Sequence, residues 1–385
     1  MSARAHAQSN PRPPLTARAC APPPRTARRA RLLLASALLA SALCGASASA
    51  QRAEPLTAAR VAQAVEQARR GPLAGDAFAQ ALALGDALLA ERRYAEAAEL
   101  FNALAEKRPR GEFFALYGAA LATFNAGRAA EAEALARRAA ESASATPPGD
   151  GAPHAAARGV RSVGAADALV LLAVVLAVRG DEAGALQAAR QAVALAPANF
   201  DAQFTLGRAL YGGDPAGAAR AFRAAVALRP QDPRPRFFLA TALERAGDAG
   251  AALAVYRELV ALHPRAAEGH LGLGVLLVKR GGAGVEEGIR ELERAVALNP
   301  EAYEARVTLG RALVTRGRAA EAVEHLRRAA ALAPGNPEPH YQLSLAYRRL
   351  GRRDEAARES AIVKSIHEAR RAAGKTGDAA PTPDE

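Results

Sequence analysis

Few residues in this chain have the types and the spacing that metal binding or catalysis requires. His263 and His270 lie seven positions apart, but we expect them on different helices, and no third metal ligand is evident. Gly374-Lys375-Thr376 imitates the end of a phosphate-binding loop, but Ala369 stands where that motif needs its first glycine, and no strand precedes it. The sequence therefore predicts neither a metal site nor a nucleotide site.

Patterns typical of hydrolases and redox enzymes are also missing. The sequence has no HExxH, GxSxG, CxxC or paired-carboxylate pattern. Its two cysteines, Cys20 and Cys44, precede the cleavage site that we predict at Ala50, so the mature chain would have no disulfide or thiolate chemistry. We predict that the protein is not an enzyme and has no cofactor.

The first fifty residues are ordered like an export signal. Four arginines between Arg25 and Arg31 precede the apolar run Leu32–Leu43, and Ala48-Ser49-Ala50 is typical of a signal-peptidase site. The apolar run is too short for a stable membrane anchor, although an uncleaved signal remains an alternative. Lipidation at Cys44 fits poorly, because the residues before it do not follow the lipobox order. We expect cleavage near Ala50 and a periplasmic protein, with only indirect membrane association unless the signal is retained.

The charge distribution argues against nucleic-acid binding. The formal net charge is +12, but seven basic residues and no acidic ones lie in the first fifty positions, which leaves 44 basic against 39 acidic side chains. These charges are interspersed, as on solvated helix faces. Aromatic residues make up only 4% and tryptophan is absent, whereas alanine, the best helix former, is abundant. The composition favours closely packed helices.

The rest of the chain has a period near 34 residues. The pentapeptide LGRAL occurs at Leu206–Leu210 and at Leu309–Leu313. Within each period, two amphipathic stretches are separated by a glycine and followed by a proline. The prolines stand at positions 197, 230, 264, 300 and 334. Small residues recur where two helices should approach closely: Ala97, Ala185, Ala252, Ala322 and Ala356. About eight helical hairpins are predicted.

This pattern resembles the tetratricopeptide repeat. The chain departs from the family pattern in lacking the tryptophan of the first helix, and leucine usually replaces the tyrosine after Leu-Gly. The resemblance implies an all-α fold, a right-handed α-solenoid of about eight helix-turn-helix units. We expect a signal peptide at 1–50, a lead-in helix within 51–77, units 1 and 2 at 78–146, a flexible insertion at 147–165, units 3 to 8 at 166–370 and a disordered tail at 371–385.

The family's binding positions give the candidate site. In such arrays the first helix of each unit lines a concave groove, and contacts cluster at its second, fifth, ninth, twelfth and thirteenth residues. Unit 3 would offer an apolar patch of Val170, Val174 and Val178. The carboxylate clamp of the chaperone-binding subfamily does not carry over, because its asparagine is absent. The other groove residues are Phe204, Arg208, Tyr211, Arg234, Phe237, Thr241, Arg245, Lys279, Arg311, Tyr341, Arg348 and Arg349.

The resemblance and the export signal together indicate a scaffold of the bacterial cell envelope that binds a protein or peptide. Aromatic residues interleaved with arginines could hold an extended peptide by stacking and by bonds to carboxylates. The alternative is an accessory subunit of an envelope machine for outer-membrane assembly, pilus formation or polysaccharide export. The sequence leaves the partner and the oligomeric state open.

Overall fold

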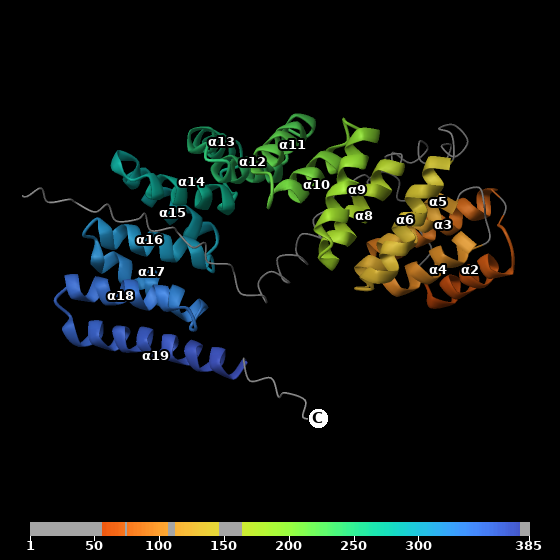
Figure 1. The fold of residues 1–385 in the computed structure, drawn as a ribbon. Coiled ribbons are helices and arrows are strands. Elements are labelled where there is room, and N and C mark those ends of the chain that lie inside the picture. The colour runs from red at the N-terminus through yellow and green to blue at the C-terminus, as the bar shows by residue number, and fades with distance from the viewer. Residues whose placement is uncertain (1–55, 74, 107–111, 146–163, 378–385) are drawn as a thin grey trace, which may run out of the picture. The chain divides into compact units, whose positions relative to one another are not determined.

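The computed structural model describes residues 56–73, 75–106, 112–145 and 164–377. These residues form one lead-in helix, α2 (Ala58–Arg70), followed by eight helical hairpins (Figure 1). The hairpins are α3 (Gly75–Ala90) with α4 (Tyr94–Glu106), α5 (Glu112–Asn125) with α6 (Ala129–Ala145), α8 (Ala165–Arg179) with α9 (Glu182–Leu195), α10 (Phe200–Leu210) with α11 (Pro215–Leu228), α12 (Pro233–Arg245) with α13 (Ala249–Leu262), α14 (Ala267–Arg280) with α15 (Val285–Leu298), α16 (Tyr303–Thr315) with α17 (Ala319–Leu332), and α18 (Pro337–Arg349) with α19 (Arg353–Gly377). The expected all-α solenoid of helical hairpins is confirmed.

The predicted signal peptide, most of the predicted insertion and the last eight residues lie outside the described residues. One predicted boundary needs correction, because α19 continues to Gly377, seven residues beyond the expected end of unit 8. Its last turns are rich in Ala, Arg and Lys, which are good helix formers. Gly374-Lys375-Thr376 is therefore helical and is not a phosphate-binding loop.

The turn inside most hairpins depends on a residue in the left-handed region. Gly127, Gly180, Gly247, Gly317 and Gly351 have φ between 73° and 90°, a conformation that glycine adopts without steric cost. In unit 1 the same place is taken by Arg92, with φ 61°.

The turn between hairpins is built on proline. The residue before each of the five periodic prolines ends the second helix with φ between −130° and −141° and ψ between 70° and 91°, because the proline ring excludes helical geometry from its predecessor. The carbonyl of that residue then accepts the amide three positions on, as in Asn199 N to Ala196 O at 3.0 Å, which closes a turn with proline in its favoured second place.

Helices within a hairpin approach closely at small residues. A Cβ added at Gly207 would lie 2.6 Å from the Phe222 ring, and one at Gly310 would lie 2.5 Å from the Leu326 side chain. In unit 6 two glycines meet, since a Cβ on Gly274 would lie 2.9 Å from the carbonyl oxygen of Gly288. A glycine at these positions therefore lets the two helices of a hairpin pack closely.

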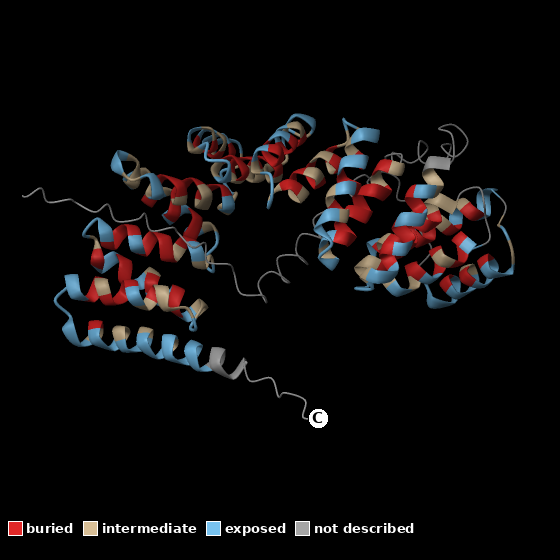
Figure 2. Cartoon of the chain, in the orientation of Figure 1, coloured by how far each residue is buried: buried red, intermediate tan, exposed pale blue. Residues whose placement is uncertain are grey.

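Consecutive hairpins stack into a continuous array. The second helix of each unit packs on the first helix of the next, including α6 on α8 across the predicted insertion. First helices of neighbouring units also touch one another, for example α8 with α10 and α16 with α18, whereas second helices contact one another much less. We call the side on which α8, α10, α12, α14, α16 and α18 lie next to one another the first-helix face. Buried residues gather where neighbouring helices pack on one another (Figure 2).

The two ends of the array are covered differently. At the start, α2 packs on α4 rather than on the first helix α3. At the other end, α19 presents mostly exposed residues along its outer side, as Figure 2 shows. Lys364 and Glu368 form a 3.9 Å ion pair there. A polar outer surface on a terminal unit is what a solenoid needs to end in water.

Candidate functional site

Most of the predicted groove residues lie on the first-helix face, but at different depths. Arg245, Lys279, Arg311, Arg348 and Arg349 are exposed. Tyr341 is 51% exposed, which is high for a large ring. The half-buried members of the set are Arg208, Tyr211, Arg234, Phe237 and Thr241.

Two of the predicted contact groups are corrected by the structure. Phe204 is only 4% exposed and belongs to the hydrophobic core of units 4 to 6, because its ring packs between Phe222 and Phe238 at 5.7 and 5.5 Å. Val170 and Val174 are also buried, at 7% exposure each. Helix α8 is apolar on every side and packs against α6, α9 and α10, so unit 3 offers no exposed patch at these two valines.

A cluster of aromatic rings joins α10, α11, α12 and α13. The rings of Phe222 and Phe238 stack at 5.4 Å. Tyr211 meets the edge of Phe238 at 6.5 Å, and Phe237 reaches Tyr256 on α13 at 6.4 Å. Such pairs stabilise beyond their buried area, by about 0.5–1.5 kcal/mol each. We call the contact between α10 and α12, with Phe204, Tyr211, Phe237 and Phe238, the aromatic seam.

Some of the predicted cations already have carboxylate partners in the chain. Arg234 forms a bidentate pair with Asp232, with Nε to Oδ1 at 3.0 Å. The hydrogen bonds that Arg234 donates to Asp232 raise the pKa of Arg234. Burial opposes ionisation of Asp232, but the same hydrogen bonds hold the pKa of its carboxyl below the usual range. Lys279 reaches back from α14 to Glu244 on α12 at 2.8 Å. Lys279 therefore ties α14 to α12, whereas Arg234 is held at the start of its own helix.

Arg245 and Arg208, unlike Arg234 and Lys279, have no carboxylate partner among the described residues. The Arg245 guanidinium lies 4.9 Å from the centre of the Tyr211 ring, a cation–π contact at the rim of the aromatic seam. Arg208 is half-buried and makes no side-chain hydrogen bond or ion pair with any described residue. Burial lowers its pKa, although the group stays protonated at any physiological pH.

A set of polar contacts at the fourth residue of the first helices was not predicted. Gln203, His270 and Arg306 bond the carbonyl of the preceding turn proline at 2.9, 3.1 and 2.7 Å. Arg236 contacts Pro230 in the same way. This is where the repeat pattern normally has tryptophan, so the missing tryptophan was the available clue.

Two of these fourth residues, and also His340 at the same place in α18, bind a glutamate on the second helix of their own hairpin. Arg236 Nε bonds Glu258 at 3.0 Å, and the Nδ1 atoms of His270 and His340 lie 2.6 Å from Glu291 and Glu359. His270 is thus a packing residue with a carboxylate partner. His263 is the C-cap of α13 and stands directly before the turn proline Pro264. No cluster of metal-binding side chains occurs among the described residues.

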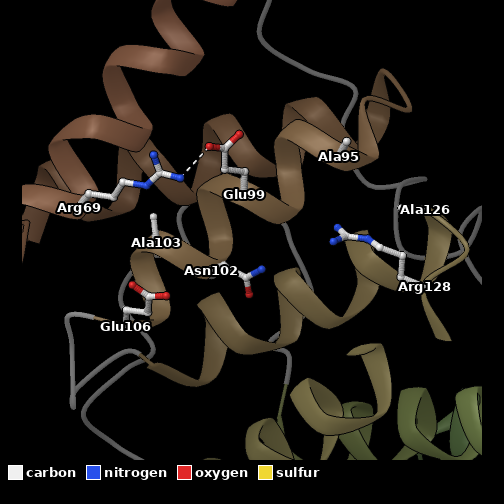
Figure 3. Close-up of a pocket in the computed structure, with 8 residues that line it drawn as sticks. All are labelled: Arg69, Ala95, Glu99, Asn102, Ala103, Glu106, Ala126 and Arg128. Carbon is white, nitrogen blue, oxygen red and sulfur yellow. Dashed lines mark hydrogen bonds and ion pairs between the residues drawn. The ribbon is translucent and has the colours of Figure 1, made fainter. Parts of the chain in front are cut away.

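A cleft of about 620 Å³ lies away from the first-helix face, between α2, α4 and the turn after α5 (Figure 3). Three of its four charged residues already have partners, since Arg69 bonds Glu99 at 2.8 Å and Arg128 bonds Glu131 at 3.0 Å. The half-buried aromatic seam with Arg208 is a stronger candidate site than this cleft.

Within the described part of the chain, every helix is too short or too polar to cross a membrane.

Stacked hairpins with a continuous first-helix face define a class of proteins that generally act as interaction scaffolds. The chain belongs to the tetratricopeptide repeat family, whose model matches residues 82–147, 206–267, 239–283 and 283–337. A search among curated proteins found no match.

Solved structures are similar to this chain in fold. The C-terminal part of a TPR repeat-containing protein from Cytophaga hutchinsonii is 16% identical, with a TM-score of 0.50 over 68% of this chain and 99% of that one. MamA from Desulfovibrio magneticus RS-1 is 23% identical, with a TM-score of 0.39 over 43% and 96%. YrrB, described as a TPR protein with an unusual peptide-binding site, is 18% identical, with a TM-score of 0.41 over 47% and 93%.

Proposed function

We propose that this protein is a non-enzymatic scaffold of the bacterial cell envelope that binds a partner protein or peptide on its first-helix face. The observation that carries the proposal is that this face is continuous across six units and combines half-buried rings with cations. Family membership supports it, because tetratricopeptide repeat proteins generally bind other proteins. A continuous row of parallel helices suits an extended segment, since each unit offers a similar set of positions to it.

The chemistry of the face favours a polypeptide over a small molecule. Tyr211, Phe237 and Tyr341 present ring surface to solvent, and Arg245, Arg311 and Arg348 are exposed on the same row of first helices. Tyrosine and arginine are enriched at the energetically important positions of protein interfaces.

The location in the envelope rests on the first fifty residues. Their order of arginines, apolar run and Ala48-Ser49-Ala50 supports export by the general route for signal peptides. N-terminal sequencing of the protein from a periplasmic extract should find Gln51 first. A chain that stays in the cytosol with residues 1–50 attached would contradict the location while leaving the binding role open.

Photo-crosslinking in cells tests the binding face. A photoreactive amino acid would replace Tyr341 or Arg311 on the first-helix face, or Arg223 or Arg290 on exposed positions of α11 and α15. We expect one shared adduct from the first two positions and none from the second two. Equal adducts at all four positions would overturn the assignment of the face. If the adduct is a subunit of an assembly or export machine, the protein is an accessory subunit.

A further inference from the structure

Arg208 is exceptional among the arginines of the described residues. Every other arginine that is not exposed has a hydrogen-bonding or ionic partner within the chain. Those arginines are Arg93, Arg229, Arg234, Arg236, Arg306 and Arg318. Arg208 alone is half-buried without one. A charge that is moved out of water without a partner costs free energy, and a carboxylate at hydrogen-bonding distance would recover it.

The surroundings of Arg208 can be located from the contacts on either side of it. On α10, Phe204 lies one turn before Arg208 and Tyr211 almost one turn after it. From α12, Arg234 lies over the Phe204 ring at 5.7 Å, and Arg245 lies over the Tyr211 ring at 4.9 Å. The two helices therefore run in the same direction, and the middle of α12, from Phe237 to Thr241, lies beside Arg208.

The backbones of α10 and α12 approach less closely than those of other consecutive first helices in the described chain. Side chains fill the extra width, because Phe204 and Tyr211 both reach Phe238 across it. The hydroxyl of Thr241 donates to the carbonyl of Phe238 at 3.0 Å, and it makes no hydrogen bond with Arg208. Among the described residues, Arg208 is thus the half-buried cation of the seam without a partner, whereas Arg245, which also lacks a carboxylate, is exposed at the rim beside Tyr211.

The charge around Arg208 matches a single carboxylate. The nearby guanidinium of Arg234 is already bound by Asp232, and that of Arg229 lies 4.0 Å from the Phe200 ring with Asp201 3.5 Å away. A planar guanidinium binds a carboxylate through two parallel hydrogen bonds, which are stronger in a partly desolvated place than in water. A phosphate group, with nearly two charges, would call for a second half-buried cation beside Arg208, whereas Arg245, the other seam arginine without a carboxylate, is exposed at the rim.

We propose that Arg208 receives the side-chain carboxylate of an internal acidic residue in an extended partner segment, and that an adjacent apolar side chain of this segment packs on Phe237 and Tyr211. The acidic residue is internal because the first-helix face continues on both sides of the seam, over α8 and over α14. This proposal rests on the proposed function and adds the chemistry of the partner. It also separates Arg208 from Arg311, which occupies the same repeat position but is exposed.

Peptide display on the whole chain tests this proposal without a known partner. A library of random twelve-residue peptides would be selected against the wild-type protein, Arg208→Gln and the control Arg223→Gln, which removes an exposed arginine of α11 away from the first-helix face. We expect enrichment of a Glu or Asp beside an apolar residue on wild type and on Arg223→Gln, and loss of the acidic residue on Arg208→Gln. No acidic enrichment on wild type, or the same enrichment on Arg208→Gln, would overturn the proposal.

Fluorescence anisotropy with an enriched peptide then measures the contact. Changing its acidic residue to the amide should weaken binding to wild type by about tenfold or more, the usual effect of a charged hydrogen bond, and should change binding to Arg208→Gln little. Arg208→Lys should keep only part of the affinity because it lacks the bidentate geometry. Tighter binding of a phosphoserine peptide, or of a peptide whose only acid is its C-terminal carboxylate, would overturn the choice of ligand. Crosslinks from Tyr341 would survive such a failure if the face itself is correct.

Discussion

The pentapeptide LGRAL occurs in α10 and again in α16, and the two copies lie in different surroundings. In unit 4, Gly207 faces the ring of Phe222, and Arg208 is half-buried beside the aromatic seam. In unit 7, Gly310 faces the flexible side chain of Leu326, and Arg311 is exposed. The same five residues thus serve the same packing role in both units, whereas the environment of the arginine depends on the neighbouring helix. A repeat motif fixes the scaffold, and the units beside it fix the surface.

The largest difference between units 4 and 7 should come from substituting the side chain that faces each glycine. Phe222→Ala should lower the free energy of unfolding by about 3–5 kcal/mol, since a large buried ring is lost. Leu326→Ala should cost about 2–5 kcal/mol. Hydrogen exchange should show loosening of α12 only for Phe222→Ala, because Phe222 stacks on Phe238. Equal loosening of α12 by both variants would contradict a seam confined to units 4 and 5.

The glycines themselves should differ by a smaller amount. Gly207→Ala should destabilise the protein by about 1–3 kcal/mol, because the new methyl group meets a ring that is fixed between Phe204 and Phe238. Gly310→Ala should cost less, because Leu326 can change rotamer and alanine favours the helix. Urea denaturation followed by circular dichroism measures both, and a greater loss for Gly310→Ala would refute this explanation.

The free energy of unfolding should respond to removal of the charge at Arg208 but hardly at Arg311. Arg208→Leu should stabilise the free protein by about 1 kcal/mol, because a partly desolvated cation without a partner is replaced by an apolar side chain. Arg311→Leu should change stability by less than about 0.5 kcal/mol, as is usual for an exposed site. The midpoint of urea denaturation decides between them. A loss of stability in Arg208→Leu would show that a contact within the chain compensates the guanidinium.

The smallest difference between the two units is in how their stability depends on pH. His325 in unit 7 precedes Leu326, at the place that Ala221 takes before Phe222 in unit 4. Burial first, and then the charge of Arg306, lowers the pKa of His325. The unfolded chain therefore takes up a proton at higher pH than the folded chain, and the free energy of unfolding should fall as the pH drops below about 6.5, until the folded state is protonated too.

The matching variant isolates this residue. His325→Ala should reduce the decrease in the urea midpoint between pH 7.5 and pH 5.5, relative to wild type. An unchanged decrease would show that other groups cause it.

Much of the fold could be predicted because the repeat constrains the sequence at many positions. The glycines with positive φ, the prolines between hairpins and the small residues at helix crossings each recur for a steric reason that a single sequence displays. The extension of α19 to Gly377 was missed because the repeat pattern ends earlier than the helix-forming residues do.

The site was less predictable, because the burial of each groove residue depends on the neighbouring helices. The position of Phe204 in the repeat indicated a groove contact, but Phe222 and Phe238 bury it. The polar fourth residues were missed because their partners are not their sequence neighbours. Some contact a turn proline six positions earlier, and Arg236, His270 and His340 contact a glutamate on the second helix. Such pairings have no local signature in the sequence.

The two kinds of turn also differ in how far their length varies. The link between hairpins has four residues at each of the five periodic prolines, whereas the turn inside a hairpin has two residues in unit 3 and four in units 4 and 6. An insertion between hairpins would change the rotation of every later unit, but an insertion inside a hairpin leaves the neighbouring units in place. The loop at Gly281–Gly284 is therefore where an epitope tag, a fluorophore or a whole inserted domain could be carried at little cost to the binding face.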